Sequence, residues 1–171
     1  ARLLVKLFNA DWKKTFSIRA PGVVNTILIV LCGLAVPVIV RVLMAGQLSG
    51  GGSDHSQYAE LEKALTSVSP LVIVLLLGVM PGITEEVLCR GALFAGFKHS
   101  LNPTKAIFLS AVLFGFMHMD PSRLLFTTIM GVVLALIVWR TGSIFLCMIL
   151  HMLNNGLQVG IGLHFEEVAK S

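Results

Sequence analysis

The chain has 171 residues, of which 56% are hydrophobic and only 13% are charged, and its formal net charge is +4. A soluble domain carries about 25% charged residues, so this composition argues against a soluble enzyme and favours one membrane-embedded domain. The excess positive charge gathers ahead of the first apolar run, which indicates a segment beside an anionic bilayer surface rather than a nucleic-acid site. These N-terminal cations are Arg2, Lys6, Lys13, Lys14 and Arg19.

The apolar runs predict membrane helices, because about 20 apolar residues suffice to cross a bilayer. In chain order we expect five, over about residues 23–44, 70–98, 103–118, 121–141 and 143–163. The predicted fold class is therefore an all-α integral membrane protein, a bundle of about five transmembrane helices around a buried polar site. We divide the chain into a basic juxtamembrane segment (1–22), the helical bundle (23–163, with its core at about 70–160) and a polar tail (164–171).

Turn and cap residues mark several of these helix ends. Asn102 before Pro103 and Asp120 before Pro121 each predict an N-cap followed by proline at the first helical position. Gly142 predicts a helix end, and Ser143 the cap of the next helix. Within the second run, Pro81-Gly82 predicts a kink. The Gly/Ser stretch after residue 45 predicts a loop, followed by a short polar helix near residues 57–68.

The charges flanking the runs predict an orientation. With five crossings, the N-terminal cations fall on the same side as Lys98, Lys105 and Arg140, whereas Asp54 and the acidic tail fall on the other side. The positive-inside rule then places the N-terminus in the cytoplasm. We expect a multi-pass protein of a prokaryotic plasma membrane.

The second run contains three charged residues in six positions: Glu85, Glu86 and Arg90. Each such group costs about 2.5–3.5 kcal/mol at the centre of a bilayer, so a functional site is the default explanation. Glu86 and Arg90 are four residues apart on a helix and can form an ion pair. Glu85 lies about 100° away around that helix and is less obviously paired.

The other buried polar candidates are few. His118 ends the third predicted helix, while His151 and Asn155 lie one turn apart on the fifth. Asn154 is expected to face about 100° away from Asn155 and to tolerate alanine. The cysteines, Cys32, Cys89 and Cys147, lack paired metal spacing and are expected to be free, buried thiols.

Several intramembrane chemistries are excluded by the motifs that the sequence lacks. It has no HExxH zinc motif and no G-x-S-x-G serine motif. Its aspartates, Asp11, Asp54 and Asp120, all lie outside the predicted helix interiors, which excludes an aspartyl dyad. A carboxylate acting on water with help from histidine remains.

Three motifs in order carry a family resemblance: EExxxR at Glu85, Glu86 and Arg90, FxxxH at Phe114 and His118, and HxxxN at His151 and Asn155. Over about residues 70–160 the chain resembles the CPBP family, also called Abi, of CAAX-protease and bacteriocin-processing membrane peptidases, which includes the type II CAAX prenyl endopeptidases.

The resemblance implies a membrane endopeptidase without a cofactor, in which Glu85 and His118 activate a water. It implies that His151 and Asn155 stabilise the oxyanion. The residues themselves agree on the base: Glu86 is compensated by Arg90, whereas Glu85, expected to be buried beside a neutral histidine, is the better proton acceptor. Phe114 is expected to be a packing wall.

Two alternatives stay open. The chain could be a non-catalytic membrane module of the same fold, serving as an immunity, scaffold or transporter-fused subunit. It could also be a metal-dependent hydrolase with glutamate and histidine ligands, although Arg90 would place a positive charge beside the ion. The expected partners are a peptide or protein substrate and the lipid bilayer, with no nucleic acid. Because the sequence begins at Ala1, fusion to or association with a larger membrane protein is also considered.

Overall fold

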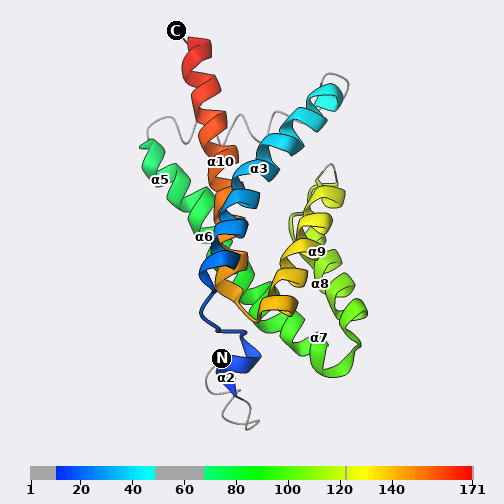
Figure 1. Ribbon diagram of the computed structural model, residues 1–171. Coiled ribbons are helices and arrows are strands. Elements are labelled where there is room, and N and C mark those ends of the chain that lie inside the picture. Colours follow the sequence, from blue (N-terminus) through cyan, green and yellow to red (C-terminus); the bar gives the residue numbers. More distant parts are fainter. Residues whose placement is uncertain (1–10, 49–67, 122, 171) are drawn as a thin grey trace. The chain divides into compact units, whose positions relative to one another are not determined.

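The structure, a computed structural model, describes residues 11–48, 68–121 and 123–170. These residues are mostly helical and contain no strand, apart from one isolated bridge between Ile18 and Ser143 (Figure 1). The described part of the chain begins with the short helix α2 (Trp12–Thr15). The predicted Gly/Ser loop and the polar helix near residues 57–68 lie almost entirely outside the described residues, as do Arg2, Lys6 and Asp54. The all-α class is confirmed.

The chain divides into two compact units. The first unit comprises residues 1–26 and 83–148, and the second comprises residues 27–82 and 149–171. Glu85, Glu86, Arg90 and His118 therefore belong to the first unit, whereas His151 and Asn155 belong to the second.

The helix that carries the charged motif is not regular. Between Pro70 and Ser100 it alternates α-helical and π-helical stretches: α5 (Pro70–Val74), η1 (Leu75–Val79), α6 (Met80–Glu86), η2 (Val87–Phe94) and α7 (Ala95–Ser100). Pro81 lacks an amide N–H, so it cannot donate the usual i→i−4 hydrogen bond of an α-helix. The π-helical η1 ends two residues before Pro81. Pro81 and Gly82 themselves lie in the α-helical α6, so the kink expected there stays a prediction, and the irregularity of this segment takes the form of π-helical turns before and after α6, which are frequent at functional sites.

Helices α8 (Pro103–Met117) and α9 (Leu124–Thr141) pack closely side by side in the first unit (Figure 1). A Cβ atom on Gly131 would lie 2.9 Å from the Cα atom of Ala111, and one on Gly115 would collide with Thr128. Small residues at such positions let two helix backbones approach, which is how helices associate where no water drives them together.

Two of the predicted helix ends are confirmed. The Asn102 side chain accepts a 2.9 Å hydrogen bond from the backbone N–H of Lys105, with Pro103 at the first helical position. Gly142 ends α9 in the left-handed conformation, with φ of 66°, and its N–H bonds the carbonyl of Val138 at 2.9 Å.

Two other predicted caps are wrong. Asp120 does not cap α9, because its carboxylate lies 3.2 Å from the Arg123 guanidinium and the helix starts only at Leu124. Ser143 does not cap α10 (Ile144–Lys170), since its buried hydroxyl has no hydrogen-bond partner among the described residues. The first N–H of α10 instead bonds the carbonyl of Ser17 at 3.0 Å.

The second unit contains most of α3 (Val23–Leu48) and of α10, which runs on through most of the predicted polar tail. Glycines set its close contacts. A Cβ on Gly33 would lie 2.8 Å from Leu153 Cδ1, and one on Gly78 would lie 3.0 Å from the Cα of Gly156. A Cβ on Gly82 would lie 2.9 Å from the backbone nitrogen of Met152. The backbone of α10 is therefore fixed against η1 and α6 near residues 152–156.

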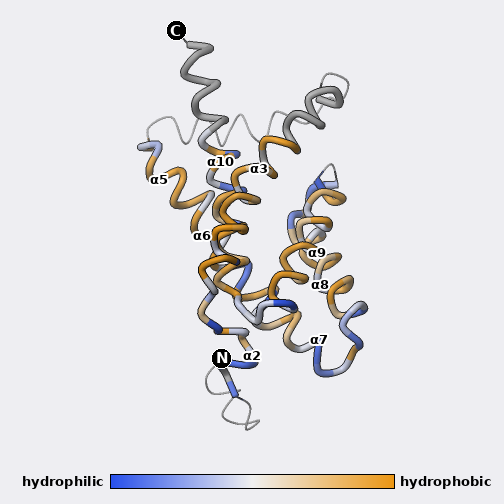
Figure 2. Tube along the Cα trace, viewed as in Figure 1, coloured by the Kyte–Doolittle hydropathy of each residue, from blue (hydrophilic) through white to orange (hydrophobic). Residues whose placement is uncertain are grey.

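Among the described residues, two helical segments, Pro70–Ser100 and Leu124–Thr141, are long and apolar enough to cross a membrane. In their most apolar windows only 22% and 33% of the residues are buried, unlike the core helices of a soluble protein. Three shorter apolar helices, Val23–Val36, Pro103–Met117 and Ile144–Gly160, accompany them. The structure thus gives five helical segments near the predicted positions without confirming five spans, and apolar residues dominate them in Figure 2.

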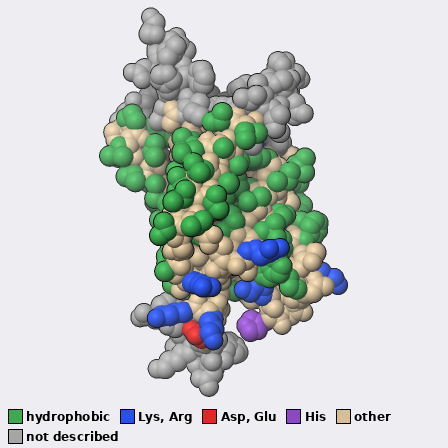
Figure 3. All heavy atoms as spheres, viewed as in Figure 1, with side chains coloured by type: hydrophobic (Ala, Val, Ile, Leu, Met, Phe, Trp, Pro, Cys, Tyr) green, Lys and Arg blue, Asp and Glu red, His purple; other side chains and the backbone are tan. Residues whose placement is uncertain are grey.

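The described surface is rich in large apolar side chains, among them Phe108, Leu125 and Leu71 (Figure 3). Large exposed apolar patches on a protein surface mark sites of membrane or protein contact. Cys32 also faces outward on α3, which contradicts its predicted burial, whereas Cys89 and Cys147 are buried, and all three are free thiols.

Candidate active site

A buried ion pair forms the anchor of the first unit. The Arg90 guanidinium donates to Glu86 Oε1 at 2.8 Å, and both side chains have an exposed fraction of 0%. Arg90 also donates to the carbonyl of Gly131 at 3.0 Å and lies 4.5 Å over the ring of Phe114. One cation therefore links η2, α8 and α9, and the predicted pairing of Glu86 with Arg90 is confirmed.

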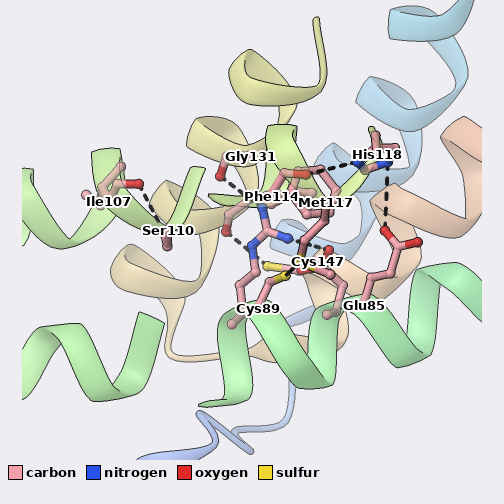
Figure 4. A network of polar contacts seen from close by, with 12 residues as sticks. Glu85, Cys89, Ile107, Ser110, Phe114, Met117, His118, Gly131 and Cys147 are labelled. Atoms are coloured by element: carbon pink, nitrogen blue, oxygen red, sulfur yellow. Dashed lines mark hydrogen bonds and ion pairs between the residues drawn. The ribbon is translucent and has the colours of Figure 1, made fainter. Parts of the chain in front are cut away.

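Glu85 and His118 face each other at the edge of this anchor (Figure 4). Glu85 Oε2 lies 4.0 Å from His118 Nε2, and each side chain is 29% exposed. Glu85 is thus half-buried rather than buried as predicted, although its Oε2 atom, which faces His118, is itself shielded from solvent. The structure brings four of the six predicted site residues together in one unit.

The orientation of His118 follows from Phe114, one helical turn before it. His118 Nδ1 is 2.9 Å from the carbonyl oxygen of Phe114, and a carbonyl can only accept, so this nitrogen carries the proton in the neutral ring. The two rings also pack edge to face, with centroids 4.9 Å apart. Nε2 is therefore the lone-pair nitrogen, and it is the one that faces Glu85.

The remaining contacts near the site involve the buried Phe114 ring and the sulfur atoms of two cysteines. Phe114 is fully buried, as expected for a packing wall, and Cys89 Sγ lies 3.7 Å from Met117 Sδ. Cys147 Sγ lies 3.2 Å from the carbonyl oxygen of Leu134 (Figure 4). Both thiols are enclosed by neighbouring side chains and behave as small apolar residues rather than nucleophiles.

The second unit carries the HxxxN motif on α10. His151 is 2% exposed, and Asn155 is half-buried one turn later. Asn154, which was expected to face elsewhere, is 4% exposed, and its Nδ2 donates to Asn155 Oδ1 at 3.1 Å. The expected tolerance of Asn154 to alanine stays a prediction, but its burial and its hydrogen bond to the neighbouring amide argue against it.

Two residues that contribute to the site, Gly131 and Asn154, were not predicted from the sequence. Gly131 supplies a carbonyl acceptor to Arg90, and its only sequence signal is a lone glycine in the apolar run of α9. Asn154 was discounted because helix geometry alone separates adjacent side chains by about 100°, and an asparagine amide can bridge that angle. A second consecutive amide in an apolar helix was the available signal.

The chain was compared with known families and proteins. The family model described as "Type II CAAX prenyl endopeptidase Rce1-like" matches residues 67–157. The chain belongs to this family. No curated protein and no solved structure matches it.

Membership in the Rce1-like family establishes the coarse function. It is a family of membrane-associated proteases, so the chain is a peptidase at the family level, in agreement with the predicted resemblance. The matched stretch contains all six predicted site residues, from Glu85 to Asn155.

Proposed function

We propose that this protein is an intramembrane endopeptidase that hydrolyses peptide bonds with a water activated by Glu85 and His118. The observation that carries the proposal is the 4.0 Å separation of Glu85 Oε2 and His118 Nε2. That distance is too long for a direct hydrogen bond. Both atoms are acceptors when the carboxylate is charged and the imidazole is neutral, so what fits between them is a donor of two protons.

Water is such a donor. Acceptors at about 2.8 Å along the two diverging O–H bonds of one water are roughly 4–4.5 Å apart, close to the separation seen here. The water oxygen then keeps its lone pairs for attack. The Phe114 carbonyl holds His118 in the required tautomer, and Arg90 holds Phe114 through its ring.

The hydrolysis follows from these roles. The water oxygen attacks the scissile carbonyl carbon as Glu85 takes up one of its protons, which gives a tetrahedral intermediate with a negative oxygen. The C–N bond then breaks, and the proton passes to the leaving amine nitrogen. Glu86, compensated by Arg90, takes no part in proton transfer and serves to hold the site together.

We further propose that His151 and Asn155 donate to the oxyanion. Each side chain can offer an N–H group to the oxyanion, and both lie on α10 within one turn. The mechanism uses no cofactor or metal.

The membrane orientation is part of the proposal. In the first unit, Lys98 lies in the last turn of α7, Lys105 in the first turn of α8 and Arg140 in the last turn of α9. Arg19 lies beside Gly142, which ends α9. Cations gather in one region of the surface in Figure 3, as expected for a cytoplasmic face. We propose a multi-pass protein of about five spans in a prokaryotic plasma membrane, with a cytoplasmic N-terminus.

Its proposed partners are a peptide or protein substrate and bilayer lipid, without nucleic acid, and with fusion to or association with a larger membrane protein as a further possibility. An impermeant thiol reagent should label Ser53→Cys and Ser171→Cys only from outside, and labelling of either from the cytoplasm contradicts the orientation.

The function is tested by purifying the protein in detergent and assaying a fluorogenic peptide library, followed by proteoliposomes. We expect cleavage that disappears in Glu85→Gln and in His118→Ala. No cleavage by the folded wild type with any peptide, prenylated peptides included, would instead support the non-catalytic module, which family membership does not favour.

A further inference from the structure

Asn154 and Asn155 are consecutive on α10, and their side chains are joined by a hydrogen bond. Asn154 Nδ2 donates to Asn155 Oδ1 at 3.1 Å, and Asn154 is the more buried of the two. The backbone here is held firmly, because the Gly78 and Gly82 positions leave no room for a Cβ against Gly156 and Met152. What is left to determine is the rotation of the Asn155 amide.

That rotation decides whether Asn155 can serve an oxyanion. A primary amide has nearly the same shape when rotated by 180°, so packing alone does not select between its oxygen and its NH₂ group. A donor to the oxygen selects one orientation. With Oδ1 occupied by Asn154, the Nδ2 group of Asn155 is left on the opposite side as a donor.

We propose that Asn154 is a positioning residue that fixes the amide of Asn155 with its NH₂ group available to the substrate oxyanion. The inference rests on the oxyanion role proposed above for Asn155. Asn154 acts only through that neighbour and does not itself contact the reacting atoms.

A purely structural role for Asn154 is disfavoured by its other atom. Asn154 Oδ1 is buried and has no hydrogen-bond partner among the described residues. An unsatisfied buried carbonyl destabilises the fold, and an apolar side chain at this position would avoid that penalty. The hydrogen bond to Asn155 is the compensating interaction that an apolar residue could not make.

The proposal predicts that Asn154→Asp lowers kcat more than Asn154→Ala does. Asn154→Ala removes the donor and lets the Asn155 amide populate both orientations, so about half of the molecules remain competent and kcat falls roughly 2–3-fold. Asn154→Asp supplies a charged acceptor that bonds Asn155 Nδ2 and selects the wrong orientation. Because charge-assisted hydrogen bonds are about twice as strong as neutral ones, kcat should fall about 10–100-fold with KM unchanged.

The test measures kcat, KM and thermal stability of the full chain, with a peptide that the wild type cleaves in the library assay, for both variants in the wild type and in Asn155→Ala. The matched control is Gln158→Ala, which removes an exposed amide from the same helix and should change nothing. We expect both Asn154 effects on kcat to vanish in the Asn155→Ala background.

Other outcomes overturn the inference. Equal losses of kcat in both backgrounds, or an Asn154→Asp enzyme with normal kcat, would show that Asn154 does not act through Asn155. If Asn154→Asp does not fold, the Asn154→Ala pair decides in the same way. If Asn155→Ala itself leaves kcat unchanged, the proposed oxyanion role is wrong and the inference fails with it. If Asn155→Ala lowers kcat but the Asn154 variants do not, the oxyanion role is retained and only the positioning role of Asn154 is rejected.

Discussion

Glu86 and Arg90 lie 2.8 Å apart, one turn from each other on the same helix, and neither side chain is exposed. Arg90 also donates a hydrogen bond to the Gly131 carbonyl and lies over the Phe114 ring, so the pair joins three helical segments. We expect Glu86→Gln to destabilise the protein by about 3 kcal/mol, because it leaves a buried guanidinium without its counter-charge. Thermal unfolding in detergent measures this loss. A Glu86→Gln protein as stable as the wild type would contradict the anchoring role.

Glu85→Gln should have the opposite profile. It keeps the size of the side chain and removes the base, so we expect a wild-type melting temperature with at least a 100-fold loss of kcat. The Glu85 side chain is partly exposed, and a glutamine of the same size can occupy its place, so we expect little loss of stability. Full turnover by folded Glu85→Gln would mean that another group activates the water.

Gly131→Ala should weaken the α8–α9 contact and the site together. The added Cβ would lie 2.9 Å from the Cα of Ala111, so the helices must separate and the carbonyl that receives Arg90 must move. We expect a loss of about 1–3 kcal/mol, the usual cost of overpacking, and lower kcat.

The matched control is Gly96→Ala, in helix α7, where an added Cβ meets nothing within 4 Å. Replacing glycine in a helix interior there should leave stability unchanged or raise it by up to about 1 kcal/mol. Equal effects of the two substitutions would show that the Gly131 contact is unimportant.

Activity should survive chelators. Arg90 sits beside the carboxylates and would repel a divalent cation. We expect unchanged kcat after prolonged treatment with EDTA and 1,10-phenanthroline. Loss of activity together with one equivalent of metal, restored by adding that metal back, would establish the metal-dependent alternative.

Features that helical spacing alone determines were predictable from the sequence, and features that depend on which partner a side chain adopts were not. The Glu86–Arg90 pair, the Asn102 cap and the Gly142 helix end each depend on residues within four positions, and the structure confirms them. The Asp120 cap failed because a nearby side chain, Arg123, competed for the carboxylate.

The contacts missed within the site depend on the partner or the rotamer that a side chain adopts. Gly131 reaches Arg90 from another helix, and the Phe114 carbonyl selects the tautomer of His118 through a side-chain rotamer. Asn154 depends on how one amide is turned. Helical periodicity reports which face a residue occupies, but it carries no information on these choices.

The π-helical stretch Val87–Phe94 sets the angular register between the two glutamates and the part of the helix that follows. Such turns behave as a residue inserted into an α-helix, so the wider winding accommodates one more residue than regular α-helical turns would. The ion pair of Glu86 and Arg90 spans the start of this stretch with a spacing of four residues. A deletion between the two would shorten that spacing to three, whereas the exchange of one apolar residue for another leaves it unchanged. Length changes should therefore be tolerated far less in this stretch than substitutions, although both leave the hydropathy of the segment almost unaltered.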